Sequence, residues 1–292
     1  MQSKARAHPL LPKQSLLVGV VQMCSTDDVE QNVNAALNAL NALRGCRLIC
    51  LPENALFLRM SKENSSTVFD LTEPFWQRFQ EFATANKADI LIGSVPLKNR
   101  RSGKNGKPTN STIWIQASGE IGPTYDKIHL FDVDVKGAPP VRESDSFAYG
   151  ESPQMIEIDG WRIGLSICYD VRFAELYSWY AERDAHLILV PAAFLVPTGE
   201  AHWHTLLRAR AIESQAFVVA AAPSGGHRNV RDERRETFGH SLVVDPWGEV
   251  LVDIENRGAT EVAVELDPAR LTKVREQIPQ STHRRLNSGR AK

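Results

Sequence analysis

The sequence predicts an α/β protein in which a mixed β-sheet system is covered by helices. Apolar runs of strand length alternate with helix-like stretches through most of the 292 residues. Near the end of the chain, several strand-like runs follow one another with turn residues between them. Alternating strands and helices are typical of α/β folds, and the closing hairpins add antiparallel strands. With 42% hydrophobic residues, the chain can bury a substantial core.

In the first half of the chain, strands and helices are predicted from the spacing of apolar residues. The segment 29–43 repeats them at helical spacing, with Asp27 or Asp28 as the N-cap. A second amphipathic helix is expected over 73–88, with Pro74 in its first turn. The strand-like runs, each short and mostly apolar, are 15–23, 46–52, 89–95 and 111–117.

The second half predicts further helices and a longer series of strands. Helices are expected over 171–183 and 202–215. Gly160 and the sequence DPWG at 245–248 have the chemistry of hairpin turns. The charge-dense segment 225–236 is expected to be a mobile loop or a solvated face. The strand-like runs are 155–159, 162–168, 186–194, 216–223, 240–246, 249–254 and 260–266.

Composition excludes several classes of partner. A net charge of −1 argues against a nucleic acid or an anionic membrane surface, since both favour a basic excess. The chain has no apolar run of membrane-spanning length. Its four cysteines do not resemble a disulfide framework, so a reducing, cytoplasmic compartment is expected. Cys46 and Cys50 lack the second pair that a zinc site needs and are interpreted as buried thiols.

The two ends of the chain are expected to be tails around one domain. Residues 1–14 are basic and lack the apolar region of a secretory signal, so they predict a flexible tail; a cleaved transit sequence is the alternative. Residues 15–285 are expected to form a single domain. Residues 286–292 are expected to be a flexible C-terminal tail.

Three reactive side chains stand where strands or turns end. Glu53 follows RLICLP, Lys127 follows GPTYD, and Cys168 follows RIGLSI. Taken singly, each has an ordinary structural explanation as a cap, a surface amine or a buried thiol. A cysteine nucleophile, however, has a free pKa of about 8.5 and needs a base, which glutamate can supply, while lysine can stabilise an oxyanion. The sequence therefore permits a Glu–Lys–Cys site, with His129 open as an alternative base.

Other common catalytic patterns are missing from the sequence. His202 and His204 are two residues apart, so they would not share a helix face and are not expected to form a metal pair. H-E-x-x-H, Gly-rich phosphate loops and G-x-S-x-G do not occur.

Six segments of the chain carry a resemblance to a known superfamily. They are LPEN (51–54), YDKIHLFDVDV (125–135), ESDSF (143–147), ICYDVRFAE (167–175), AHWHTLLRARAIESQAFVVAAA (201–222) and GHSLVVDPWGEV (239–250). Over about Ser15 to Arg285, the chain resembles the nitrilase, or carbon–nitrogen hydrolase, superfamily. The resemblance implies a four-layer αββα sandwich, paired into a homodimer or a higher even oligomer. Within the superfamily, the last two matching segments resemble the Nit branch of amidases.

The resemblance also implies catalytic roles. Cys168 would be the nucleophile at a strand-to-helix elbow, and Glu53 the general base that later protonates the leaving amine. Lys127 and the backbone N–H of Tyr169 would stabilise the oxyanion. Glu143 would orient Lys127 or the substrate. The implied mechanism passes through a thioester and requires no metal or organic cofactor.

Substrate-binding residues are implied with alternatives. Arg172 corresponds to an arginine that contacts a substrate carboxylate in some relatives, although a surface or helix-capping arginine is the alternative. Thr198 begins TGEAHWH, a segment expected at the rim of the pocket and to contribute to substrate binding. There, Glu200 and His204 replace the proline and glutamate that are common in the family.

The expected reaction is hydrolysis of a small anionic amide with release of ammonia. Deaminated glutathione is the preferred substrate, because LLRARAIESQAFVVAAA is closer to that type of amidase. An ω-amidase acting on α-ketoglutaramate is the first alternative, and an N-carbamoyl hydrolase or nitrilase the second. A catalytically silent binding module is the alternative of a different class.

Overall fold

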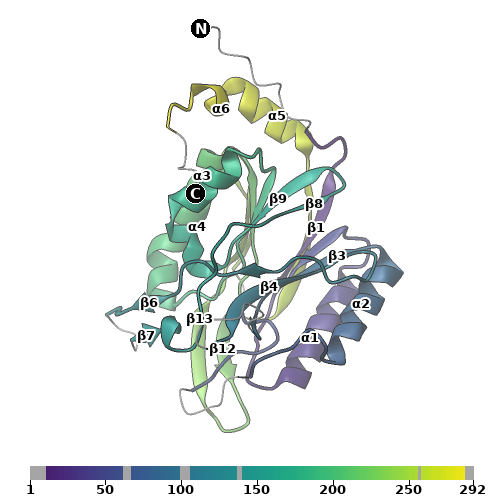
Figure 1. Cartoon of the computed structure of the whole chain (residues 1–292), viewed down its shortest axis with the longest axis vertical. Helices are drawn as coiled ribbons and strands as arrows, with labels where there is room; N and C mark the ends of the chain where they lie inside the picture. The colour runs from purple at the N-terminus through teal and green to yellow at the C-terminus, as the bar shows by residue number, and fades with distance from the viewer. Residues whose placement is uncertain (1–10, 62–66, 99–105, 137–139, 256–257, 287–292) are drawn as a thin grey trace.

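The computed structural model describes residues 11–61, 67–98, 106–136, 140–255 and 258–286. One six-stranded sheet has three parallel strands at its centre and antiparallel strands outside them (Figure 1). In spatial order its strands are β16 (Thr260–Leu266), β1 (Leu16–Gln22), β2 (Leu48–Cys50), β3 (Asp89–Leu97), β4 (Thr109–Ile115) and β5 (Tyr125–Asp126).

The second six-stranded sheet repeats this arrangement. Its central strands are again parallel, and the antiparallel strands lie on both sides of them. In spatial order the strands are β15 (Val250–Ile254), β14 (Ser241–Val244), β11 (Phe217–Ala220), β10 (Leu187–Leu189), β9 (Trp161–Leu165) and β8 (Met155–Ile158). Because parallel strands align their carboxyl ends, both sheets gather the loops that follow these strands at one edge.

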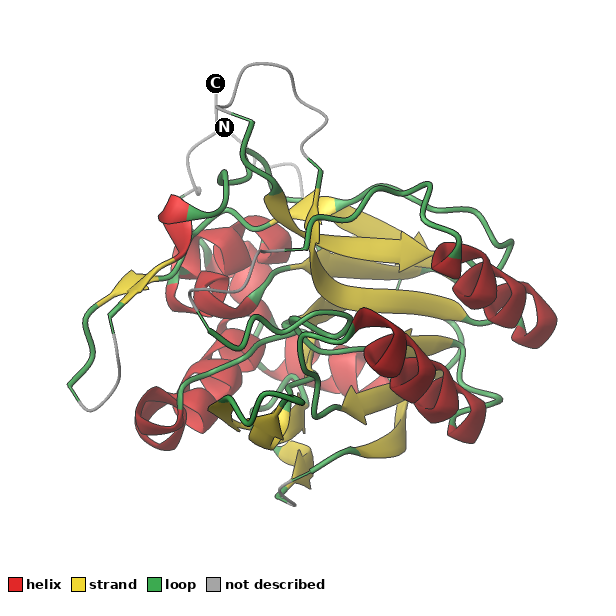
Figure 2. Ribbon diagram, turned by 90° about the horizontal axis from the view of Figure 1, so that it is seen from below, coloured by secondary structure: helices red, strands yellow, loops and turns green. Residues whose placement is uncertain are grey.

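Helices cover the outer face of each sheet, as Figure 2 shows. Buried side chains of α1 (Val29–Ala42) and α2 (Phe75–Asn86) form one apolar cluster with the first sheet. A larger cluster joins the facing sides of both sheets with α3 (Ala174–Ala181) and α4 (Val196–Ser214). The predicted αββα sandwich is therefore confirmed. Two short helices, α5 (Pro268–Gln277) and α6 (Gln280–His283), complete the described chain.

Local sequence signals explain where the first helices begin and end. The Asp28 side chain accepts a hydrogen bond from the Gln31 N–H, so it is the N-cap of α1, one of the two caps that the sequence predicts. Pro74 directly precedes α2 rather than lying in its first turn. Lys87 ends α2 in the left-handed conformation, with φ of 53°.

Three predicted elements differ from the structure. Helix α4 begins at Val196, six residues before the expected start, and carries a proline in its first turn. The expected helix over 171–183 is divided into a 3₁₀ turn, η2 (Cys168–Arg172), and α3. The expected loop at 225–236 is wrong, since most of it belongs to a hairpin of β12 (Ser224–Arg228) and β13 (Arg234–Phe238).

Short elements that the sequence analysis did not predict frame one corner of the molecule. They are β6 (Asp132–Val133), β7 (Val141–Arg142) and the 3₁₀ turn η1 (Glu143–Asp145). Of the expected N-terminal tail, the structure describes residues 11–14, where Pro12 is buried and the Gln14 carbonyl accepts a hydrogen bond from Trp161. Residues 1–10 and 287–292 lie outside the described residues. In the described chain, none of the helices combines the length and apolar character needed to cross a membrane.

Candidate active site

Three distant segments bring Glu53, Lys127 and Cys168 together. Glu53 follows β2 of the first sheet, Lys127 follows β5, and Cys168 follows β9 of the second sheet. All three are buried, with exposed fractions of 3%, 2% and 6%. The site therefore lies where loops from the two sheets meet, as the predicted strand-end positions require.

The Glu53 carboxylate makes contacts with several residues of the site. Its Oε1 accepts hydrogen bonds from Lys127 Nζ at 3.0 Å and from Asn110 Nδ2 at 3.1 Å. Its Oε2 accepts one from the Ala193 N–H at 2.8 Å. The same carboxylate is close enough to the Cys168 thiol for its charge to raise the pKa of that thiol. Glu53 is thus positioned to receive the thiol proton.

Lys127 lies between two carboxylates. Its Nζ is 2.9 Å from Glu143 Oε2 and 3.0 Å from Glu53 Oε1. Glu143 is itself held by the Phe131 N–H at 2.6 Å and by Asn110 at 3.0 Å. Asn110 therefore bridges both carboxylates. Sequence reasoning missed this residue, because nothing in the local pattern around β4 distinguishes it from any other polar strand residue.

The pKa shifts define the protonation states at rest. Burial raises the pKa of Glu53, but the Lys127 ammonium and the hydrogen bonds from Cys168 and Lys127 outweigh it, so the pKa lies below its usual range. Burial lowers the pKa of Lys127, yet the two carboxylates hold it well above its ordinary value. Burial and then the Glu53 charge raise the pKa of the Cys168 thiol well above its ordinary value. At neutral pH the group is a carboxylate, an ammonium and a neutral thiol.

Cys168 sits at a strained turn. Its φ is 49°, in the left-handed region that non-glycine residues rarely adopt. The Cys168 N–H donates to the Pro191 carbonyl at 2.8 Å. The next N–H, that of Tyr169, is in the first turn of η2, where backbone donors have no helical partner. Within the described chain, no acceptor takes up this N–H, which leaves it available to a ligand.

Asp170 connects the nucleophile turn to the segment that carries Lys127. Its buried carboxylate accepts hydrogen bonds from the Ile167 N–H at 2.9 Å, the Tyr125 hydroxyl at 2.7 Å and the His129 N–H at 2.9 Å. Tyr125 and His129 flank Lys127 in the sequence, so a single carboxylate fixes both catalytic segments. No role was predicted for Asp170 from the sequence. Its position two residues after Cys168, within the motif ICYDVRFAE, is the signal that could have identified it.

His129 does not occupy the position of a base for Cys168. Its Nδ1 lies 2.7 Å from Asp170 Oδ1, and its ring stacks on Phe173 with 3.6 Å between centroids. The carboxylate close to the Cys168 thiol is instead that of Glu53. The geometry favours the carboxylate over the imidazole as the proton acceptor.

The two predicted substrate-binding residues lie on different elements, Arg172 in η2 and Thr198 in the first turn of α4. The Arg172 guanidinium stands over the rings of Tyr169 and Phe194, at 5.8 and 5.4 Å from their centroids, and 3.3 Å from a His202 nitrogen. Thr198 is buried, and its hydroxyl donates to the Leu195 carbonyl within the first turn of α4. Glu200 is exposed on the same helix.

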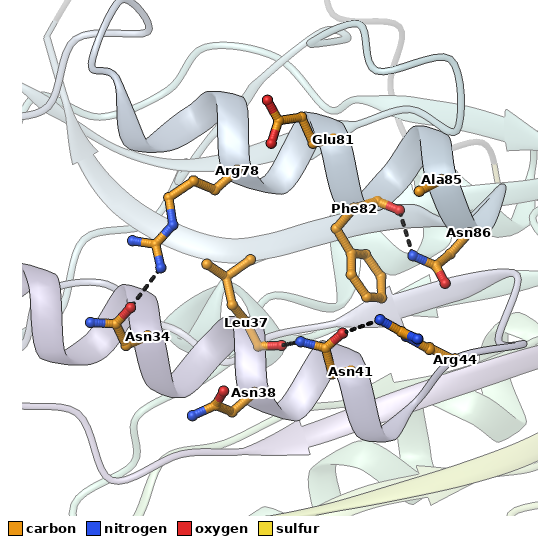
Figure 3. A pocket seen from close by; sticks show the side chains of 10 residues that line it. All are labelled: Asn34, Leu37, Asn38, Asn41, Arg44, Arg78, Glu81, Phe82, Ala85 and Asn86. Atoms are coloured by element: carbon orange, nitrogen blue, oxygen red, sulfur yellow. Dashed lines mark hydrogen bonds between the residues drawn. The ribbon is translucent and has the colours of Figure 1, made fainter.

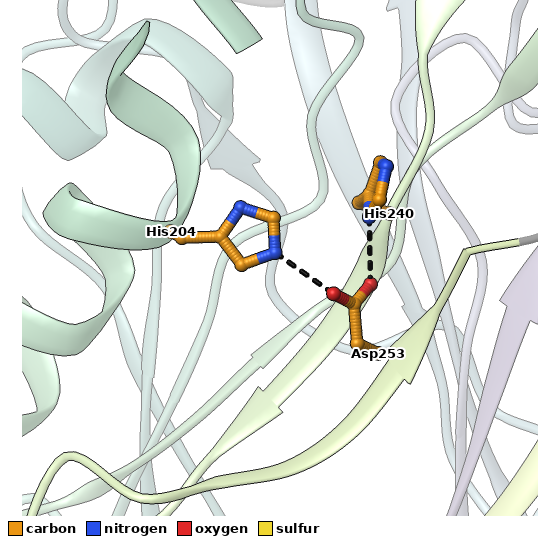
Figure 4. A group of neighbouring side chains, drawn as sticks. All are labelled: His204, His240 and Asp253. Carbon is orange, nitrogen blue, oxygen red and sulfur yellow. Dashed lines mark hydrogen bonds and ion pairs between the residues drawn. The ribbon is translucent and has the colours of Figure 1, made fainter. Parts of the chain in front are cut away.

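His202 and His204 diverge, as their spacing predicts. His202 faces Arg172, whereas His204 lies 2.8 Å from Asp253, which also contacts His240 at 2.8 Å (Figure 4). The donor atoms of this second group lie within 4.8 Å of one another, a set that suits a divalent transition metal. Here both imidazoles already bond to the carboxylate and tie α4 to the β14–β15 hairpin. Sequence analysis missed the trio because its members are far apart in the chain.

Open grooves on the surface lie away from this chemistry. One groove of about 480 Å³ runs between α1 and α2 (Figure 3). It is lined largely by amides and arginines that bond to one another, such as Arg78 to Asn34 at 2.6 Å. None of the predicted catalytic residues lines this groove, so we assign it no chemical role despite its size.

Comparison with known families agrees with this geometry. A family model described as carbon-nitrogen hydrolase matches residues 17–276. The chain belongs to the carbon–nitrogen hydrolase family. A deaminated glutathione amidase from a Synechocystis strain is 38% identical over 275 residues, which cover 92% of this chain and 97% of that protein. The bovine deaminated glutathione amidase is 36% identical, covering 92% and 82% of the two chains.

Solved structures place this carbon–nitrogen hydrolase beside members of the Nit branch. The structure of the Caenorhabditis elegans NitFhit protein superposes with a TM-score of 0.79 at 34% identity, covering 93% of this chain and 65% of that one. The chain spans 60% of the length of the NitFhit fusion protein in sequence comparison. Saccharomyces cerevisiae Nit3 gives a TM-score of 0.78 at 26% identity, covering 96% of this chain and all of that one.

Proposed function

We propose that this carbon–nitrogen hydrolase cleaves deaminated glutathione by a Glu53–Lys127–Cys168 triad. The observation that carries the proposal is the shared contact of one buried carboxylate with both the ammonium and the thiol. The names of relatives at 35–38% identity, from Synechocystis to Yersinia enterocolitica, favour this substrate over α-ketoglutaramate. An ω-amidase activity on α-ketoglutaramate is retained as the second candidate, because the two substrates share their acyl half.

The first half-reaction forms a thioester. Glu53 accepts the thiol proton while Cys168 Sγ bonds to the amide carbon, and the carbonyl electron pair moves to oxygen. The resulting oxyanion is stabilised by the Lys127 ammonium and the Tyr169 N–H. When the C=O bond re-forms, the C–N bond breaks and the leaving amine takes the proton from Glu53. For deaminated glutathione this amine is cysteinylglycine, so the release of ammonia expected from the sequence applies to α-ketoglutaramate and not to the preferred substrate.

The second half-reaction regenerates the thiol. Glu53 accepts a proton from water, whose oxygen attacks the thioester carbon. The C–S bond then breaks, and the sulfur recovers the proton from Glu53. Glu143 and Asn110 keep Lys127 and Glu53 in place throughout, which supports their role as positioning residues.

The chain is further proposed to act as a cytoplasmic homodimer. All four cysteines are free, which suits a reducing compartment. Exposed apolar side chains gather where α4 approaches the β14–β15 turn, a surface that a second copy would cover. They are Ile212, Trp247, Val250 and Leu251.

The proposed function is tested with the purified, reduced chain and a small amide panel. We expect deaminated glutathione to be converted to 2-oxoglutarate and cysteinylglycine, detected by mass spectrometry. α-Ketoglutaramate, an N-carbamoyl amino acid and a nitrile are measured beside it. Cys168→Ala serves as the inactive control, and hydroxylamine should trap the acyl group as a hydroxamate. The proposal is rejected if the unaltered protein turns over none of these substrates.

A further inference from the structure

Arg235 faces the interior of the molecule from strand β13. In a strand, successive side chains point to opposite sides, and directly paired residues of antiparallel strands share a side. Arg235 pairs with His227, and both His227 and Thr237 are buried. The neighbouring Arg234 points the other way and its side chain is 71% exposed. Arg235 is therefore the inward arginine of a hairpin whose other charges face solvent.

The hairpin is fixed against the catalytic loops. The Phe238 N–H donates to the Phe194 carbonyl at 3.0 Å, and the preceding residue, Ala193, donates to Glu53. Arg235 Nη1 donates to the Arg59 carbonyl at 2.9 Å, and Arg59 lies six residues after Glu53 in the chain. One backbone–backbone contact and one contact of the Arg235 side chain thus hold β13 beside the carboxylate that is the proposed base.

Among the described residues, no carboxylate forms an ion pair with Arg235. Burial lowers the pKa of its guanidinium, while the charges of Glu53, Cys168 and Glu143 raise it, and Glu53 acts most strongly of the three. Within the described chain, however, Arg235 has no carboxylate at ion-pair distance, and its hydrogen bond goes to a backbone carbonyl. A partly buried cation without a partner is costly, so an anionic group of a ligand would compensate it.

Two arginines would then recognise different parts of the substrate. Arg172 is on the turn that carries Cys168 and the proposed oxyanion donor Tyr169. In the proposed mechanism, this turn would contact the acyl part of the substrate. Arg235 is on the side of Glu53, which delivers the proton to the leaving amine. The leaving group must therefore extend from the Glu53 side.

We propose that Arg235 binds a carboxylate on the leaving amine of the substrate, so that the enzyme selects amides whose amine half is itself an anion, such as a peptide. This inference rests on the proposed amidase function and deepens it. It explains how one site could prefer deaminated glutathione, which carries a carboxylate on both halves, to α-ketoglutaramate, whose leaving group is ammonia.

The test compares three substrates that share the same acyl half. These are deaminated glutathione, its C-terminal carboxamide and α-ketoglutaramate. In the unaltered protein, the carboxamide should have a kcat/KM about 10- to 100-fold below that of the carboxylate. In Arg235→Ala, the ratio between carboxylate and carboxamide should fall to near one. Arg234→Ala, an exposed arginine one residue away, should keep the ratio of the unaltered protein.

Each outcome has a separate meaning. If the unaltered protein cleaves the carboxylate and the carboxamide equally well, the inference is overturned while the amidase function stands. A carboxylate preference that persists in Arg235→Ala also overturns it. Absence of turnover on all three substrates would overturn the proposed function and the inference together. Because the carboxamide comparison uses the unaltered chain, the test does not depend on the folding of a variant.

Discussion

In the proposed mechanism, Glu53 performs two tasks that impose opposite demands on a buried carboxylate. It must be ionised to accept the thiol proton, and it must release that proton to the leaving amine. Burial alone would keep it protonated, and the Lys127 ammonium reverses this. The same carboxylate raises the pKa of Cys168, so the thiol stays neutral until a substrate arrives. The proton therefore moves during attack rather than before it.

This coupling predicts the behaviour of Glu53→Gln. Turnover should fall by about 10²- to 10⁴-fold, because the base is lost. At the same time, the pKa of the Cys168 thiol should decrease, since the Glu53 charge that raises it is gone while Lys127 remains. The pH at which iodoacetamide labels half of Cys168 in a fixed time should move down relative to the unaltered protein.

The exposed thiol of Cys24 provides the internal control for this measurement. Its labelling midpoint should be the same in both proteins. A midpoint for Cys168 that stays fixed or moves up would contradict the assigned coupling between Glu53 and the thiol.

The sequence predicts some members of the proposed site and not others, for a physical reason. Glu53, Lys127, Glu143 and Cys168 belong to local motifs, so their residue types and neighbours predict them. The role of Asn110 exists only because β4 passes two carboxylates that are 57 and 33 residues away in the chain. Such a contact leaves no local pattern, and Arg235 escaped prediction in the same way.

At the scale of elements, prediction succeeded where one face is clearly apolar. Helix α1 follows its 3.6-residue spacing and its Asp28 cap to within one residue. The strands β12 and β13 were missed, because their buried side carries His227 and Thr237, which bond to each other at 2.7 Å. A strand with a polar buried face shows no apolar alternation. The start of α4 was missed because Pro197 and Gly199 are ordinarily turn residues.

Gly199 has a packing role that explains its place in α4. A Cβ at this position would lie 2.1 Å from Cγ of Phe238 on β13. Gly199→Ala should therefore push the hairpin away from the helix. We expect the free energy of unfolding to decrease by about 1–3 kcal/mol in a urea titration. The kcat/KM for the anionic amide should decrease as well, because β13 carries Arg235.

Gly226→Ala is the matched control in the same hairpin. Its added Cβ would meet no heavy atom within 4 Å. The change in unfolding free energy should then stay within about 0.5 kcal/mol. Equal stability of Gly199→Ala and Gly226→Ala would remove the proposed packing role of Gly199.

At the scale of the whole molecule, each of the two similar sheets contributes part of the proposed site. The first sheet contributes Glu53 and Lys127, and the second contributes Cys168 and the loop with Ala193. Two contacts connect the halves. Asp170 of the second half accepts a hydrogen bond from the Tyr125 hydroxyl of the first. In the hairpin β12–β13, the Ser224 N–H donates to the Met23 carbonyl, which follows β1. The proposed catalysis therefore requires the two sheets to keep their relative position, which the shared apolar core between them provides.

An exposed apolar edge of the second sheet supports the proposed homodimer. Strand β15 is an edge strand, and Val250 and Leu251 on it are 38% and 42% exposed. Ile212 on α4 and Trp247 in the adjacent turn are 43% and 50% exposed. An apolar edge of this kind invites pairing with another chain, and a second copy that covers it would form a closed dimer.

Ile212→Glu should break this dimer, because burying a carboxylate against apolar side chains costs several kcal/mol. In sedimentation equilibrium, the mass should fall from twice the chain mass of 32.5 kDa toward a single chain. Val230→Glu, at a position that is 97% exposed between β12 and β13, should leave the mass unchanged. If the unaltered protein sediments as one chain, the apolar surface is not a dimer interface. If Ile212→Glu remains dimeric, the contact between copies lies elsewhere on the molecule.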